Sequence, residues 1–102
     1  MNLSMIKQAL ELRSKLEKTQ KELAKMTVEA QSDDGAIKVK ANGRQKILSI
    51  KISPEVIDPK KSTQLEKLVL KVVTDALDKS KKLADKHLSK LTGGIKIPGI
   101  TD

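Results

Sequence analysis

The sequence predicts an α+β fold of two layers, in which a helix, a three-stranded antiparallel β-meander and a long helix follow one another in the order α-β-β-β-α. Apolar residues recur at three- and four-residue steps near both ends of the chain, and between them they alternate with polar residues in three short runs. The dipeptide Asn42-Gly43, a strong hairpin signal, separates two of these runs. A chain of 102 residues is long enough for one core. We therefore expect a single domain over residues 1–92 and a Gly- and Pro-containing tail over residues 93–102.

The first helix is expected over residues 2–26, which contain no Pro or Gly and offer Asn2 or Ser4 as an N-cap. One stripe along it alternates steps of four and three, the heptad spacing with which two helices pack side by side. The stripe is formed by Met5, Ala9, Leu12, Leu16, Thr19, Leu23 and Met26. It fits two interpretations equally well: a seam against a partner helix, or an amphipathic helix that lies on its own domain.

The three alternating runs predict strands with one apolar face. The apolar positions are Val28 and Ala30, then Ile37, Val39 and Ala41, then Leu48, Ile50 and Ile52. Lys38, Lys40 and Lys51 take alternate positions, so the opposite face is expected to be solvated and basic. Residues 32–35, Ser-Asp-Asp-Gly, form the first turn. Asn42-Gly43 forms the second, because both residues tolerate positive φ.

The second helix is expected to begin at a capping box of Thr63 and Glu66 and to end at Gly93, which suits a C-cap. From Thr63 to Leu91 it would be about 43 Å long, whereas strands of five or six residues extend only about 20 Å. The apolar residues of its last turns therefore project beyond the sheet. They are Leu83, Ala84, Leu88 and Leu91.

This overhang needs a partner, which is either the first helix of the same chain or a second copy. The chain has no Phe, Tyr or Trp, so its core lacks the large buried area that rings supply. A second subunit would add the missing area, and a homodimer with projecting helices is therefore favoured. Its expected interface consists of Leu12, Leu16, Leu23, Leu83 and Leu88.

No catalytic or metal site is expected, and no cofactor or small-molecule substrate. The chain has no Cys and a single His, so a nucleophile pair or a His-rich metal site would rest on His87 alone. His87 lies among apolar residues at helical spacing, which indicates the edge of an apolar face. Gly93-Gly94 follows a helix instead of joining a strand to one, so it is not a phosphate-binding loop.

The charge distribution points to a polyanionic partner. The net charge is +8, and residues 79–96 carry six Lys and one Asp, whereas residues 62–78 carry two Lys and three acidic residues. With 19 Lys and 2 Arg, contacts to the phosphate backbone are expected rather than bidentate reading of bases. The missing aromatics remove the stacking platforms of single-strand binders. The backbone of a nucleic-acid duplex is therefore the expected partner.

Eight basic side chains on the two helices are expected to contact DNA. They are Lys7, Arg13, Lys15, Lys79, Lys81, Lys82, Lys86 and Lys90. No apolar run approaches the about 18 residues of a membrane span, and the first ten residues lack the apolar core of a signal peptide. We therefore expect a cytoplasmic protein with no membrane partner.

The order of elements and several short motifs resemble the YbaB/EbfC family of bacterial nucleoid-associated proteins. The motifs are Lys7-Gln8-Ala9, then Gly35, Ile37, Val39 and Gly43, then Ile50-Lys51-Ile52-Ser53-Pro54, then Leu65-Glu66-Lys67-Leu68-Val69 and Asp75-Ala76-Leu77, and finally Gly93-Gly94 and Pro98-Gly99. The resemblance implies a homodimer in the nucleoid whose helices project like tweezers, bind double-stranded DNA and in some members influence transcription. It implies no cofactor and no enzymatic activity. The sequence departs from the family by a first helix with Leu and Arg where Met and Gln are frequent, and by Val72-Val73 where Ala is common.

Two other classes of protein remain as alternatives. A prefoldin-like holdase chaperone also joins two helices through β-hairpins, but its helices would need to be much longer than these. An RNA-binding or ribosome-associated protein would share the basic composition. Gel shift, competition between DNA and RNA duplexes, and suppression of client aggregation distinguish the three.

Overall fold

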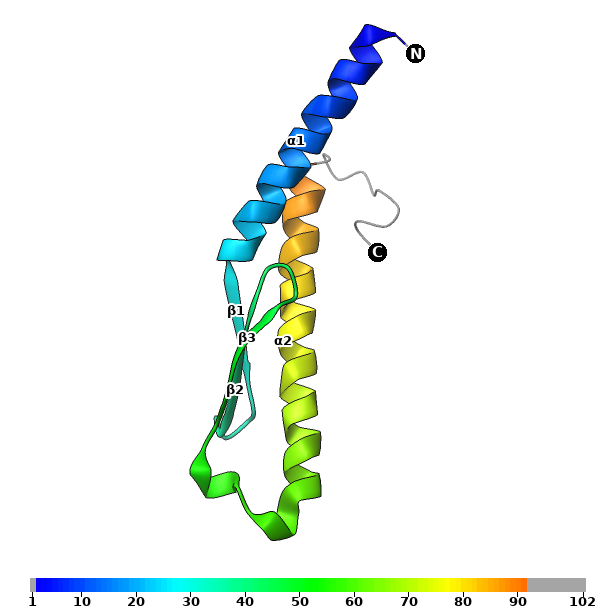
Figure 1. Ribbon diagram of the computed structural model, residues 1–102. Helices are drawn as coiled ribbons and strands as arrows, with labels where there is room; N and C mark the ends of the chain where they lie inside the picture. Colours follow the sequence, from blue (N-terminus) through cyan, green and yellow to red (C-terminus); the bar gives the residue numbers. More distant parts are fainter. Residues whose placement is uncertain (1, 92–102) are drawn as a thin grey trace.

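A computed structural model describes residues 2–91 and contains the predicted elements in the predicted order. They are α1 (Leu3–Lys25), β1 (Thr27–Gln31), β2 (Ile37–Asn42), β3 (Ile47–Ile52) and α2 (Ser62–Leu91), with short 3-10 helices at Pro54–Val56 and Pro59–Lys61. The strands form one antiparallel sheet in the order β1-β2-β3. Figure 1 shows the sheet and α2 side by side as two layers, with α1 extending beyond the end of α2. The α+β fold class is confirmed, while the predicted cap at Gly93 lies outside the described residues.

The core lies between α2 and the first two strands. Its buried side chains are Ala30, Ile37, Val39, Ala41, Val72 and Ala76. Helix α2 packs mainly against β1 and β2, so it covers the inward-facing side chains of β3 only in part. Ile50 is 45% exposed although its cross-strand partner Val39 is fully buried.

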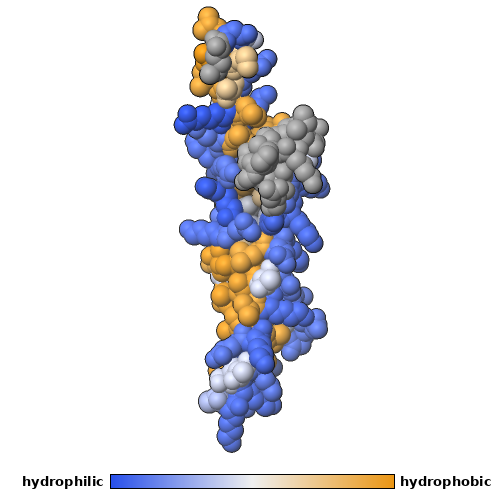
Figure 2. Space-filling view, turned by 90° about the vertical axis from the view of Figure 1, so that its right-hand side faces the viewer, coloured by the Kyte–Doolittle hydropathy of each residue, from blue (hydrophilic) through white to orange (hydrophobic). Residues whose placement is uncertain are grey.

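The uncovered side of this core is a shallow apolar groove between β3 and α2, which we call the β3–α2 groove. It is lined by Ile52, Leu65, Glu66, Val69, Leu70 and Val73. Leu70 is 67% exposed there. Figure 2, which views the molecule from the side of α2, shows an apolar area in its lower half.

The predicted register of β3 was wrong at Leu48. A bulge between Lys40 and Ala41 pairs Ala41 with Ile47 and Lys40 with Ser49, so Leu48 is the extra residue. Ile47 therefore packs against the core in its place. Leu48 is exposed.

The β2–β3 hairpin is confirmed, but the reason given for Asn42-Gly43 was wrong. In residues 2–91, Gln45 is the non-glycine residue with a positive φ, at 61°. Neither Asn42 nor Gly43 adopts the left-handed conformation. Gly43 is needed for close packing instead, because a Cβ there would lie 2.7 Å from the carbonyl oxygen of Leu23. Its N–H donates to that same carbonyl at 2.9 Å, which fixes the end of α1 on the hairpin.

A buried serine of α2 ties the same hairpin to the second layer. The Oγ of Ser80 donates to the carbonyl of Asn42 at 2.6 Å and accepts from the N–H of Gln45 at 2.9 Å. The Asn42 side chain accepts from the N–H groups of Arg44 and Lys46. These bonds hold α2 against the β2–β3 hairpin.

Replacing Ser80 by alanine is expected to destabilise the fold by about 1–2 kcal/mol, because the buried carbonyl of Asn42 loses the Ser80 hydroxyl and the N–H of Gln45 keeps only its bond of 3.2 Å to that carbonyl. Chemical denaturation of the purified protein measures this. Ser14→Ala, at an exposed position of α1 away from the hairpin, is the matched comparison. An unchanged unfolding midpoint for Ser80→Ala would contradict the role assigned to the serine.

The two helix starts differ from each other. The Asn2 side chain accepts from the N–H of Met5 at 2.8 Å, which confirms Asn2 as a cap of α1. The capping box at Thr63 and Glu66 was wrong, since Thr63 already lies inside α2. The 3-10 helix Pro59–Lys61 leads directly into α2, and the Asp58 side chain caps that 3-10 helix.

The predicted turn between β1 and β2 is held by its acidic residue. Asp34 accepts from the N–H of Ala36 and from the hydroxyl of Ser32, and these bonds, the backbone one first, lower the pKa of the Asp34 carboxyl. Gly35 has a φ of 72°, the left-handed conformation that favours glycine. Asp33 and Asp34 are thus turn residues.

The overhang of α2 packs against α1 of the same chain (Figure 1). Leu23 is 1% exposed and Leu88 is 4% exposed. Their own chain already covers these two side chains, and their part in a dimer interface stays a prediction. The first half of α1 extends past this contact with its stripe exposed. Within residues 2–91, neither helix is apolar enough over its length to cross a membrane.

Candidate nucleic-acid interface

The second half of α2 presents a row of four lysines. Lys79, Lys82, Lys86 and Lys90 are separated by three, four and four residues, which places them along one side of the helix. All four are exposed, and Lys79 and Lys82 flank β1, where they line a groove together with Ala30 and Gln31. Lys81 is also exposed but lies outside this row.

The first lysine of the row is fixed to the sheet. The Nζ of Lys79 donates to the carbonyl of Glu29 in β1 at 2.8 Å. Asp75 and Asp78 line the same shallow groove as Lys79 and Lys82, and they lower the positive potential there. The potential of the row is therefore highest towards Lys86 and Lys90.

The three other predicted residues on the helices belong to α1. Lys7 lies on the half of α1 that extends beyond α2, and Lys15 follows two turns later. Arg13 donates to the Glu17 carboxylate at 3.2 Å. This is the one ion pair among the described residues, so Arg13 is partly neutralised while the lysines have no carboxylate within 4 Å.

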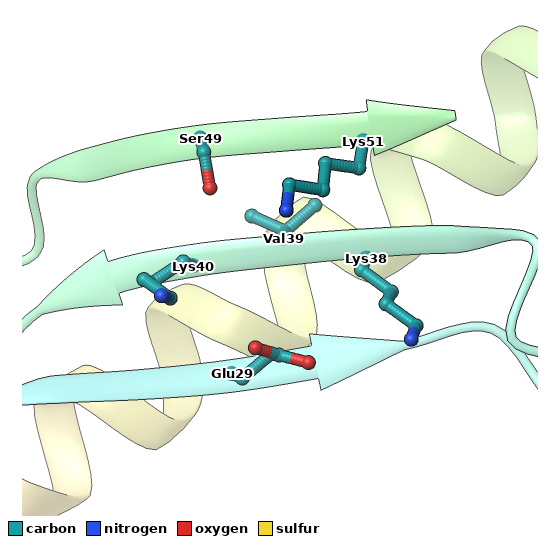
Figure 3. Close-up of a pocket in the computed structure, with 6 residues that line it drawn as sticks. All are labelled: Glu29, Lys38, Val39, Lys40, Ser49 and Lys51. Carbon is teal, nitrogen blue, oxygen red and sulfur yellow. The ribbon is translucent and has the colours of Figure 1, made fainter. Parts of the chain in front are cut away.

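A second basic surface lies on the sheet face that points away from α2, where the sequence analysis placed no site residue. Figure 3 shows Lys38, Lys40 and Lys51 on this face together with Glu29 and Ser49. The signal was present in the alternation of these lysines with core residues. The gathering of lysines from β2 and β3 depends on the strand register, which the sequence does not fix across the bulge.

His87 takes part in an ordinary helix contact. Its Nδ1 lies 3.0 Å from the carbonyl of Leu83, one turn earlier, and its side chain is half-buried. Across residues 2–91, no three His, Cys, Asp or Glu side chains come together in a way that could hold a metal ion.

A two-layer α+β domain with lysine rows on exposed helices is typical of a small protein that binds nucleic acids. Residues 1–95 match the YbaB/EbfC DNA-binding family, so the chain belongs to that family. It is 46% identical over 96 residues to a nucleoid-associated protein of Myxococcus xanthus, with 94% of this chain and 91% of the relative covered. It is 41% identical over 97 residues to a nucleoid-associated protein of Thermoanaerobacter pseudethanolicus, with 95% and 87% covered.

A solved structure shares the fold. The crystal structure of an uncharacterized protein from Helicobacter pylori matches with a TM-score of 0.76, covering 91% of this chain and 99% of that one. Because the two sequences are 14% identical, this likeness concerns the fold alone.

Proposed function

We propose that the protein is a homodimeric nucleoid-associated protein that binds double-stranded DNA through lysine contacts to the phosphate backbone. The observation that carries this proposal is membership of the DNA-binding family in a chain whose α2 lysines are exposed and have no carboxylate within 4 Å among the described residues. The chain would act in the nucleoid within the cytoplasm, without enzymatic activity, and would organise DNA and influence transcription.

Lysine chemistry supports backbone contacts over base reading. An ammonium group meets a phosphate as a mobile point charge, whereas the planar fork of arginine suits bidentate contacts to guanine. The row on α2 contains only lysines, and Arg13 is already engaged by Glu17. Sequence discrimination is therefore expected to be low.

The β3–α2 groove is the surface on which we place the dimer contact. Its apolar side chains continue to Ile50 on the edge strand β3, so a second copy would bury both an apolar area and an unpaired strand edge.

A competition gel shift tests the proposed function. Labelled DNA duplex is expected to shift with the protein and to be displaced by unlabelled DNA duplex more readily than by RNA duplex of the same sequence. Stronger competition by RNA would favour the ribosome-associated alternative. Absence of a shift together with suppressed aggregation of a model client would favour the chaperone alternative.

A further inference from the structure

The sheet face that points away from α2 carries an excess of positive charge, which does not stabilise the sheet. We call it the outer sheet face and define it by Glu29, Lys38, Lys40, Ser49 and Lys51 (Figure 3). Successive residues of a strand point to opposite faces. These side chains are therefore the alternates of the buried Ala30, Ile37 and Val39.

Two lysines of this face repel each other across neighbouring strands. Lys38 of β2 lies directly opposite Lys51 of β3 in the register, and like charges directly opposite across two strands destabilise a sheet. Glu29 lies opposite Lys40, but no carboxylate of the described residues comes within 4 Å of any of the three lysines. The face thus keeps three unneutralised ammonium groups.

We propose that the outer sheet face is a second surface for the phosphate backbone of a DNA duplex, separate from the lysine row of α2. This proposal rests on the proposed function. Helix α2 covers the inner face of the same sheet (Figure 1), and its lysine row meets the sheet at the β1 edge, where Lys79 donates to the carbonyl of Glu29. Lys38, Lys40 and Lys51 instead point away from α2 on β2 and β3 (Figure 3). The two basic surfaces therefore face different directions, and one protein molecule would hold two duplex segments.

Charge complementarity selects a duplex as the occupant. A second copy of the chain placed on this face would bring lysines against lysines. The residues named above include no apolar or aromatic side chain exposed for burial or for stacking of unpaired bases. A regular row of phosphates neutralises the Lys38–Lys51 pair directly.

A two-duplex capture assay tests the proposal. Biotinylated duplex is immobilised, protein is bound, and retention of a second, fluorescent duplex is measured. The sheet variant carries Lys38→Gln, Lys40→Gln and Lys51→Gln, and the matched control carries Lys60→Gln, Lys61→Gln and Lys67→Gln, which removes the same charge from exposed positions. We expect the sheet variant to retain at least about tenfold less second duplex while its affinity for the first stays within about twofold.

The possible outcomes separate this proposal from the proposed function. Wild-type protein that binds the first duplex but captures no second one overturns the outer sheet face and leaves the proposed function standing. Equal capture by the sheet variant and the control overturns it as well, because a dimer would then bridge through its helices. Wild-type protein that binds no duplex overturns both.

A second variant separates loss of DNA capture from loss of stability. Lys51→Glu places a carboxylate opposite Lys38, so the melting temperature is expected to stay the same or rise while capture of the second duplex falls. A fall in the melting temperature with unchanged capture would show that Lys51 serves the sheet alone and would contradict the proposal.

Discussion

Replacing Lys82, Lys86 and Lys90 together by glutamine is expected to lower the affinity for duplex DNA by about a hundredfold near physiological salt. These lysines are exposed, belong to one side of α2 and have no carboxylate partner in the part of the chain that the structure describes. Each lost phosphate contact also reduces the slope of log affinity against log salt by about one. Fluorescence anisotropy with a labelled duplex at several salt concentrations measures both effects.

Lys79 is left in place in this variant because its Nζ also holds the carbonyl of Glu29, so its removal would mix binding with stability. The matched control is the triple variant of Lys60, Lys61 and Lys67, which carries the same loss of charge. Light scattering should show the same dimer for all three proteins. Equal DNA affinity of the α2 variant and the control would contradict the assigned site.

Replacing Leu70 by glutamate is expected to convert the proposed dimer to a monomer. Leu70 is 67% exposed in the chain, so the substitution should leave the fold of the protomer unchanged. A symmetric interface contains each residue twice. Two unpaired carboxylates buried in an apolar contact raise the dissociation constant by about a hundredfold or more. Light scattering after size exclusion, over a range of protein concentrations, measures the change.

The comparison for this variant is Leu12→Glu, on the exposed stripe of α1 that the sequence analysis assigned to the dimer. A dimer that survives Leu70→Glu and dissociates with Leu12→Glu would place the interface on α1 and contradict the β3–α2 groove. With the groove as the interface, Leu12→Glu stays dimeric. DNA affinity should fall with Leu70→Glu, because the monomer offers a single lysine row.

The fold could be predicted from the sequence because its signals are local. Helical spacing, strand alternation and the Asn42-Gly43 hairpin each depend on neighbouring residues. The predictions were wrong at positions whose conformation depends on residues that are distant in the sequence. Leu48 is displaced by a bulge whose register depends on β2, and Gly43 is required by the approach of Leu23 from another element.

The candidate site was predictable to the same degree. The excess of lysines in the second half of α2 follows from composition and helical spacing alone. The tie of Lys79 to Glu29 and the covering of Leu23 and Leu88 by their own chain depend on how α1, β1 and α2 pack. The uncovered β3–α2 groove likewise follows from the lateral position of α2 over the sheet, for which the sequence holds no local signal.

The most direct measurement of the central claim is a titration of duplexes of unrelated sequence at two salt concentrations. With about six phosphates neutralised per dimer, log affinity is expected to fall with log salt at a slope of about −5. The affinities of the different sequences should agree within about tenfold, far below the factor of about a thousand or more that separates specific from non-specific binding. Binding without salt dependence, or one sequence bound about a thousandfold more tightly than the rest, would contradict the account.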